Sequence, residues 1–169
     1  MTGPVLAIDP GPEKSSWVLW CPATERVQQG GDQVANGDLE TLLSSRDECR
    51  TACLCDVAQL VIERPVVLGG HGASAALLET AYWAGVFTGA WPGDTDLLTY
   101  HRVRSHLTQC GSAKEAQVKQ ALISRFAPSG FGKEGKGTVK APGPFHGVAG
   151  HMWSAVAVAV AWCDLRGRV

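Results

Sequence analysis

The chain has 169 residues, 45% of them hydrophobic, and a formal net charge of only -1. These values indicate one folded domain over residues 1 to 169 and exclude a disordered chain. No apolar run reaches the roughly 18 residues that a membrane-spanning helix needs. The start, MTGPVLAIDPG, also lacks the basic region and cleavage site of a signal peptide. We therefore expect a cytoplasmic protein with no membrane partner.

The first predicted elements are short strands with tight connections. PVLAIDPG is an apolar run closed by turn residues, which predicts a buried strand with Asp9 at its end. SSWVLWC alternates weakly and predicts a second strand, and RVQQGG with QVANG predicts a third. We expect these segments to form an antiparallel meander.

A helical pattern follows from Asp38 to about Asp56. Asp38 is a suitable N-cap, and one side of the helix is predicted to carry Leu39, Leu42, Leu43 and Cys53.

Within the same stretch, CRTACLC contains Cys49, Cys53 and Cys55. Structural zinc sites usually need a second cluster of ligands, and none with a suitable spacing follows. Reduced, buried thiols are therefore favoured over a zinc site.

The next strand, AQLVIERP, is apolar until Glu63, and Pro65 ends it. After the loop VVLGGHG, a helix is predicted from Ala73 to Gly89. It is apolar on more than one side, which suggests burial against both the sheet and another subunit; the residues concerned are Leu77, Leu78, Ala81, Tyr82 and Trp83. DTDLLTY is predicted to be the last strand.

Two helices are then predicted, over Val103 to Gln109 and over Ala113 to Phe126, with Ser112 as N-cap of the second. The following segment, 130–147, has six glycines, two prolines and three lysines, which predicts a mobile basic loop without a core element. Phe131 or Phe145 in this loop could stack on an opened DNA base, and burial of the rings is the alternative.

The last element is the run GHMWSAVAVAVAW. Its alternation permits a strand, but its length and alanine content favour a helix from about Val148 to Leu165. On a helix, one face would carry His151, Ser154, Ala155 and Val158. Together the elements predict an α/β fold with a mixed five-stranded sheet flanked by helices.

Charge is distributed unevenly along the chain. Residues 1–98 carry five basic and thirteen acidic side chains, whereas residues 99–140 carry eight basic and two acidic ones. Such asymmetry is typical of a nucleic-acid-binding face on an acidic body, and a solvated basic face without a partner is the alternative.

Two acids, Asp9 and Glu63, end apolar strands. A carboxylate is costly to desolvate there unless it is paired or binds a cation. If the two strands are neighbours, the acids form a hard-oxygen pocket suited to Mg²⁺ or Mn²⁺. The alternative is structural: Asp9 caps the IDPG turn and Glu63 pairs with Arg64.

Four segments, in this order, resemble the RuvC-like Holliday junction resolvases of the RNase H superfamily. They are AIDPG, LVIERP, YHRVRSHLTQCGSAKEAQVKQAL and the terminal H-x-x-S-A-x-A-x-A. The compact length and the glycine-rich loop look like a phage-type or otherwise divergent member. The resemblance implies an RNase H-like fold and a homodimer that nicks four-way DNA junctions through divalent metal ions in DNA recombination and repair.

The resemblance also assigns roles to individual residues. It places metal-binding catalytic residues at Asp9, Glu63, His151 and Ser154, and a basic residue at Arg104. The family's lysine near the glycine-serine turn has no clean counterpart, because this chain reads AKEA where the family tends to read AEKS; Lys114 is the candidate substitute. The cations predicted to contact DNA phosphates are Arg102, Arg104, Lys114, Lys119, Lys133, Lys136 and Lys140.

Ser154 is the main departure, since the family has an Asp at this position. A serine hydroxyl is a neutral, weak ligand and brings no negative charge to a dication. Three explanations are open: an engineered replacement of Asp that inactivates the chain, a natural serine with His151 carrying the metal, or a natural protein that binds branched DNA without cutting it. We favour the first slightly.

The sequence thus predicts a junction endonuclease, with a non-catalytic branched-DNA-binding protein as the alternative. A strand-end Asp near Gly also occurs in ATP-binding folds of the actin and sugar-kinase type. Those folds need further glycine-rich phosphate loops and normally a much longer chain, which this sequence lacks.

Overall fold

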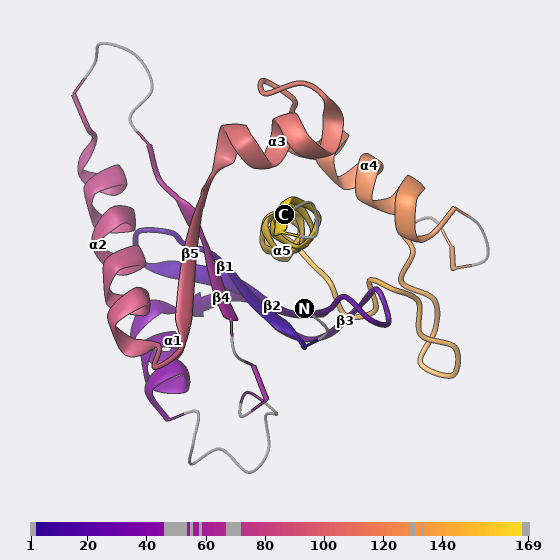
Figure 1. Ribbon diagram of the computed structural model, residues 1–169, viewed down its shortest axis with the longest axis horizontal. Coiled ribbons are helices and arrows are strands. Elements are labelled where there is room, and N and C mark those ends of the chain that lie inside the picture. Colours follow the sequence, from indigo (N-terminus) through magenta and orange to yellow (C-terminus); the bar gives the residue numbers. More distant parts are fainter. Residues whose placement is uncertain are drawn as a thin grey trace.

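A five-stranded mixed sheet lies at the centre of the protein, as predicted (Figure 1). The computed structural model describes residues 3–45, 54, 56–57, 59–66, 72–128, 131–132 and 134–166. The strand order is β3-β2-β1-β4-β5, where β1 pairs antiparallel with β2 and parallel with β4. The strands are β1 (Val5–Asp9), β2 (Lys14–Cys21), β3 (Arg26–Ala35), β4 (Gln59–Arg64) and β5 (Asp94–Thr99).

Helices cover both faces of the sheet (Figure 1). One face is covered by α1 (Asn36–Ser44) and α2 (Ala75–Ala90). On the other, α5 (Met152–Arg166) packs on β1 and β2, and α3 (Tyr100–Thr108) and α4 (Glu115–Phe126) lie over α5. Across the described ranges, no helix combines the length and the apolar character that a bilayer crossing requires.

The alternation of side chains along the central strands divides the core into two layers. In β1, Val5 and Ala7 pack in the layer around α5, whereas Leu6 and Ile8 pack in the layer around α1 and α2. Successive side chains of a strand point to opposite faces, so the next residue, Asp9, points to the α5 side. The period of two therefore determines which layer receives the strand-end acid.

Helix α5 confirms the helical interpretation of the alanine and valine run. Its residues from Met152 to Trp162 are buried, except Ser154, which is half-buried. A helix enclosed by the sheet on one side and by two helices on the other needs no polar face. This enclosure explains why the run lacks a clear helical period in the sequence.

The two predicted N-cap residues, Asp38 and Ser112, are wrong. Helix α1 begins at Asn36, with Ala35 as its N-cap, so Asp38 lies in the first turn. The Asn36 amide is buried and accepts a 2.7 Å hydrogen bond from Ser15 Oγ, which ties the helix start to β2. Helix α4 begins at Glu115, with Lys114 rather than Ser112 as N-cap, because the Gln117 side chain accepts the Lys114 N–H at 2.8 Å.

Helix α1 also ends at Ser44, well before the predicted end near Asp56. The cysteines of the CRTACLC motif, Cys49, Cys53 and Cys55, lie outside the described residues. Their state as thiols or zinc ligands stays a prediction.

The segment 130–147 contributes to the core, contrary to the prediction. Phe145 is fully buried and contacts Trp20 and Trp153, with ring centroids 6.4 and 4.9 Å away. The segment is joined to β3 because Val27 N–H donates to Pro144 O at 2.9 Å. Of the two interpretations of Phe145, burial is therefore correct and base stacking is wrong. The mobility of the segment stays a prediction.

We expect Phe145→Ala to destabilise the protein by about 3 to 5 kcal/mol, because it leaves a cavity between large aromatic rings. Urea unfolding followed by tryptophan fluorescence measures this loss. Val139 in the same segment is 88% exposed, so Val139→Ala should change stability by less than about 0.5 kcal/mol. Equal small effects of both substitutions would show that the segment does not support the core.

Candidate functional site

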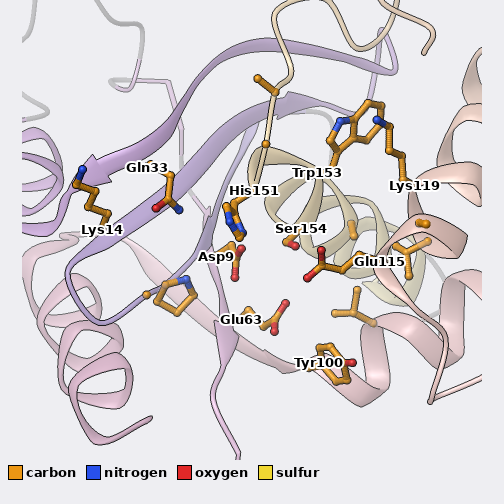
Figure 2. A pocket seen from close by; sticks show the side chains of 18 of the residues that line it. Asp9, Lys14, Gln33, Glu63, Tyr100, Glu115, Lys119, His151, Trp153 and Ser154 are labelled. Carbon is orange, nitrogen blue, oxygen red and sulfur yellow. The ribbon is translucent and has the colours of Figure 1, made fainter. Parts of the chain in front are cut away.

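Asp9 and Glu63 come together at the ends of adjacent parallel strands. The register pairs Ile8 with Ile62, so the two acids follow at the same edge of the sheet. Val61 packs in the same layer as α5, and alternation therefore places Glu63 on that side too. Figure 2 shows both carboxylates facing one cleft. The structural alternative for Glu63 does not hold, because the exposed Arg64 follows on the opposite face of the strand.

The start of α5 brings the other two predicted residues to the same place. Ser154 lies in the first turn of the helix, and its hydroxyl hydrogen-bonds the Asp9 carboxyl group. His151 directly precedes the helix and lies near enough for its charge to act on Asp9. All four predicted site residues line the same cleft (Figure 2). The sequence prediction of which side chains meet is therefore consistent with the geometry.

Asp32 on β3, which the sequence reasoning missed, holds the start of α5. Its Oδ1 accepts hydrogen bonds from His151 N–H at 2.9 Å and from Ser16 Oγ at 3.0 Å. Gly150 has a φ of +40°, and a Cβ at this position would overlap the Asp32 carboxylate. Glycine is thus required where the chain turns into the helix. No sequence pattern links Asp32 to residue 151, because the contact spans 119 positions.

The cleft has a volume of about 960 Å³. Besides the four predicted residues, its walls carry three further acids, Glu13, Glu115 and Glu134, and Glu115 is the first residue of α4. Lys14, at the start of β2, lies on the opposite wall and was also missed (Figure 2). The sequence did not predict Glu115 as a site residue, because the segment AKEAQ has the pattern of an ordinary helix start. Only the packing of α4 shows that the Glu115 side chain is directed into the cleft.

The two central acids resist ionisation. Burial, the largest cause, raises the pKa of Asp9 to about 6, and the His151 charge partly opposes this effect. Burial also raises the pKa of Glu63 to about 8; the neighbouring Asp9 adds to the rise and the Arg104 guanidinium opposes it. Two carboxylates forced together in a partly desolvated place disfavour each other's charge. A bound cation would instead favour the ionised form of both carboxyl groups and lower their pKa values.

The donor set suits a hard divalent cation. Asp9 and Glu63 offer carboxylate oxygens in one cleft, which Mg²⁺ and Mn²⁺ prefer. Within the described part of the chain, no three His, Cys, Asp or Glu side chains are placed so as to hold one metal ion together. The structure therefore provides a two-carboxylate pair as the core of the site.

The predicted DNA-contacting cations divide into two groups. Three of them, Arg104, Lys119 and Lys136, line the cleft. The remaining described ones, Arg102, Lys114 and Lys140, are exposed but are not part of its walls. Lys133 lies outside the described residues. Lys114, the candidate substitute for the family's lysine near the glycine-serine turn, therefore lies outside the walls of the cleft.

The cleft cations are held in place by their neighbours. Arg104 donates to Ala113 O and stacks over the Tyr100 ring, 3.5 Å from its centroid. Lys119 and Lys136 share Glu134, at 2.5 and 2.6 Å from its two carboxylate oxygens. These contacts lower the pKa of Glu134 to about 2 and place a positive wall beside the acidic floor.

The sheet order and the C-terminal helix packed across the sheet give an α/β fold of the RNase H-like class. Among solved structures, Thermus thermophilus RuvC has this fold. It is 13% identical to this chain, the alignment covers 98% of this chain and 96% of that one, and the TM-score is 0.61. T. thermophilus RuvC in complex with Holliday junction substrate matches at 15% identity and a TM-score of 0.62, with 97% and 94% of the two chains covered.

No family model matches the chain, and no curated protein matches it by sequence. The similarity to the two RuvC structures therefore concerns the fold.

Proposed function

We propose that this protein is a metal-dependent endonuclease that cuts branched DNA, with four-way junctions as its substrate class. The observation that carries the proposal is the pairing of Asp9 and Glu63 under the first turn of α5 in a RuvC fold. One of the similar structures is a complex with a Holliday junction, which supports the choice of substrate. The positive wall beside the acids suits a phosphate backbone.

In this proposal, Asp9 and Glu63 hold Mg²⁺ or Mn²⁺, and His151 offers a ring nitrogen at the edge of the cleft. The bound ion would activate water and offset charge on the phosphate under attack. Ser154 orients the Asp9 carboxyl group through its hydrogen bond. Asp32 fixes the backbone of His151, so the first turn of α5 keeps its position over the strand ends.

The basic residues would bind the DNA backbone. Arg104, Lys119 and Lys136 are presented from three different parts of the chain, and each is held by a neighbouring group. Such contacts position DNA without reading bases, so binding should weaken steeply as salt rises. The acids on the cleft floor would repel phosphate in the absence of a cation, which makes productive binding depend on the metal.

A second candidate function is binding of branched DNA without cleavage. The observation in its favour is that the Ser154 hydroxyl donates to Asp9 and brings no charge to the site. Under this alternative, junction binding depends on the cations of the cleft and is unaffected by Asp9 beyond its charge.

A cleavage assay separates the two functions. The protein is incubated with a labelled synthetic four-way junction, and with a linear duplex of the same sequence, in Mg²⁺, Mn²⁺ or EDTA. The nuclease proposal expects metal-dependent nicks near the branch point of the junction and few in the duplex. Junction binding with no nick in either metal would favour the binding protein.

We also propose that the protein forms a homodimer through α2. The outer face of this helix exposes two large side chains, Leu78 (61% exposed) and Tyr82 (62% exposed). Further along the same face, Gly85 and Gly89 have open space where a side chain would stand. An apolar, partly flat helix face of this kind suits a second copy of itself across a two-fold axis.

We expect Leu78→Glu to shift the protein towards monomer at micromolar concentration, because two like charges would face each other across the axis. Light scattering coupled to size-exclusion chromatography measures the mass. Val139→Glu, which adds the same charge at an exposed residue of another segment, should leave the mass unchanged. A monomeric parent protein would contradict the dimer proposal.

A further inference from the structure

Glu115 faces the proposed metal site from the wall opposite Asp9. It is the first residue of α4, and its carboxylate projects into the cleft towards Ser154 and the two strand-end acids (Figure 2). Its negative charge is close enough to raise the pKa of both Asp9 and Glu63. Glu115 therefore belongs to the same cleft although it comes from a different element.

The nearest cation on its own helix does not neutralise Glu115. Lys119 lies four residues further on, and a Glu followed by a Lys at this spacing is a favourable ion pair on a helix. Lys119 Nζ instead contacts Glu134 Oε1 at 2.5 Å and lies over the Trp153 ring. Within the described residues, the Glu115 carboxylate has no ion pair or hydrogen bond of its own, so it is available to a ligand of the cleft.

We propose that Glu115 supplies the third carboxylate to the divalent cation, in place of the charge that serine does not provide at position 154. This inference rests on the proposed nuclease function and names a ligand for the same site. Ser154 donates a hydrogen bond to Asp9 and is neutral, so Asp9 and Glu63 alone would leave the ion with two carboxylates. Glu115, which lies on the facing wall of the cleft, would raise the number of carboxylates around the ion to three.

In this proposal, the Glu115 side chain rotates towards the two strand-end acids when the ion binds. The described acids are not yet close enough for three of them to hold one ion, and like charges repel one another until a cation lies between them. Glu115 is exposed, and a glutamate has three rotatable side-chain bonds, so little packing opposes its movement. The backbone is well placed for this, since α4 packs against α5.

The test measures Mn²⁺ binding by isothermal titration calorimetry, without DNA and independently of cleavage. Glu115→Gln should weaken Mn²⁺ affinity by about tenfold or more, since even outer ligands of metal sites are worth that much. The control is Asp38→Asn, which also removes an acid from the first turn of a helix but at a site away from the cleft. It should bind Mn²⁺ like the parent.

A double-mutant cycle then tests whether residues 115 and 154 share one role. Ser154→Asp should restore Mn²⁺ affinity in the Glu115→Gln background and should gain much less in the parent, where Glu115 already provides the charge. Equal gains in both backgrounds would overturn the inference. So would a Glu115→Gln variant that binds Mn²⁺ as the parent does.

The variant Asp9→Asn distinguishes a failure of the inference from a failure of the proposed function. If Asp9→Asn weakens Mn²⁺ binding while Glu115→Gln does not, the site exists and Glu115 is not its ligand. If neither substitution changes Mn²⁺ binding, the metal site itself is wrong and the inference fails with it.

Discussion

Asp9→Asn is expected to reduce metal-dependent junction cleavage by at least about a hundredfold while the protein keeps its fold. Loss of groups that only orient the ligands of a metal costs about 10 to 100-fold, so loss of a charged ligand should cost no less. The substitution keeps the shape of the side chain and its capacity to accept the Ser154 hydrogen bond. Initial rates of junction nicking in Mg²⁺ and Mn²⁺ measure the effect.

Junction binding by Asp9→Asn should not fall with its cleavage activity. Removing one negative charge from the cleft floor lowers the repulsion of DNA phosphates, so Asp9→Asn should bind the junction as tightly as the parent or more tightly. Asp38→Asn serves as the matched control for both assays, because it replaces an exposed acid on α1. Full cleavage activity in Asp9→Asn would place the active site elsewhere on the molecule.

The second large effect concerns stability and pH. Without divalent cations, the protein should become less stable as the pH rises from about 4.5 to about 8. In the folded state Glu63 has a pKa of about 8 against an ordinary 4.5, and Asp9 about 6 against 3.8. Between these values the folded protein retains protons that the unfolded chain releases, so raising the pH favours unfolding.

Glu63→Gln removes most of this pH dependence because the amide does not ionise. We expect the variant to be more stable than the parent by about 4 kcal/mol at pH 8.5 and by less than about 1 kcal/mol near pH 5, where Glu63 of the folded protein is neutral. Urea unfolding in EDTA at the two pH values measures the difference. A parent protein that is as stable at pH 8.5 as at pH 5 would show that the pKa of Glu63 is not raised in the folded protein.

Addition of Mn²⁺ provides an internal check on that experiment. At pH 8.5 the cation should stabilise the parent, because it binds the ionised acids of the folded state. It should stabilise Glu63→Gln much less, since one of the two paired carboxylates is gone. The two measurements together connect the pKa of Glu63 to the proposed metal site.

The central part of the site was predictable because it depends on local pattern. An apolar run closed by Pro or Gly predicts where a buried strand ends, which placed Asp9 and Glu63 at strand ends. Their meeting required only that β1 and β4 be parallel neighbours. His151 and Ser154 entered through the resemblance of the terminal helix to a known family, and the helix start places both in the cleft.

Other features were not predictable because they depend on distant contacts. The cap residues of α1 and α4 differ from the expected ones, since Asn36 bonds the loop after β1 and Gln117 bonds the backbone of Lys114. The segment 130–147 looked like a solvent loop from its composition, yet Phe145 completes the aromatic cluster around Trp20. Composition reports the average of a segment and does not identify the one side chain that packs.

The sequence by itself determined the strands, the layer of helices and the two acids at the strand ends, because periodicity and turn residues act within a few positions along the chain. Only the tertiary structure decided which charges face those acids. In the folded protein Lys119 pairs with Glu134, and Glu115 faces Asp9 and Glu63 across the cleft. The Asp32 carboxylate accepts a hydrogen bond from the backbone at the start of α5. Electrostatic partners are set by distance in space, and packing of the helices on the sheet brings together residues that the chain separates.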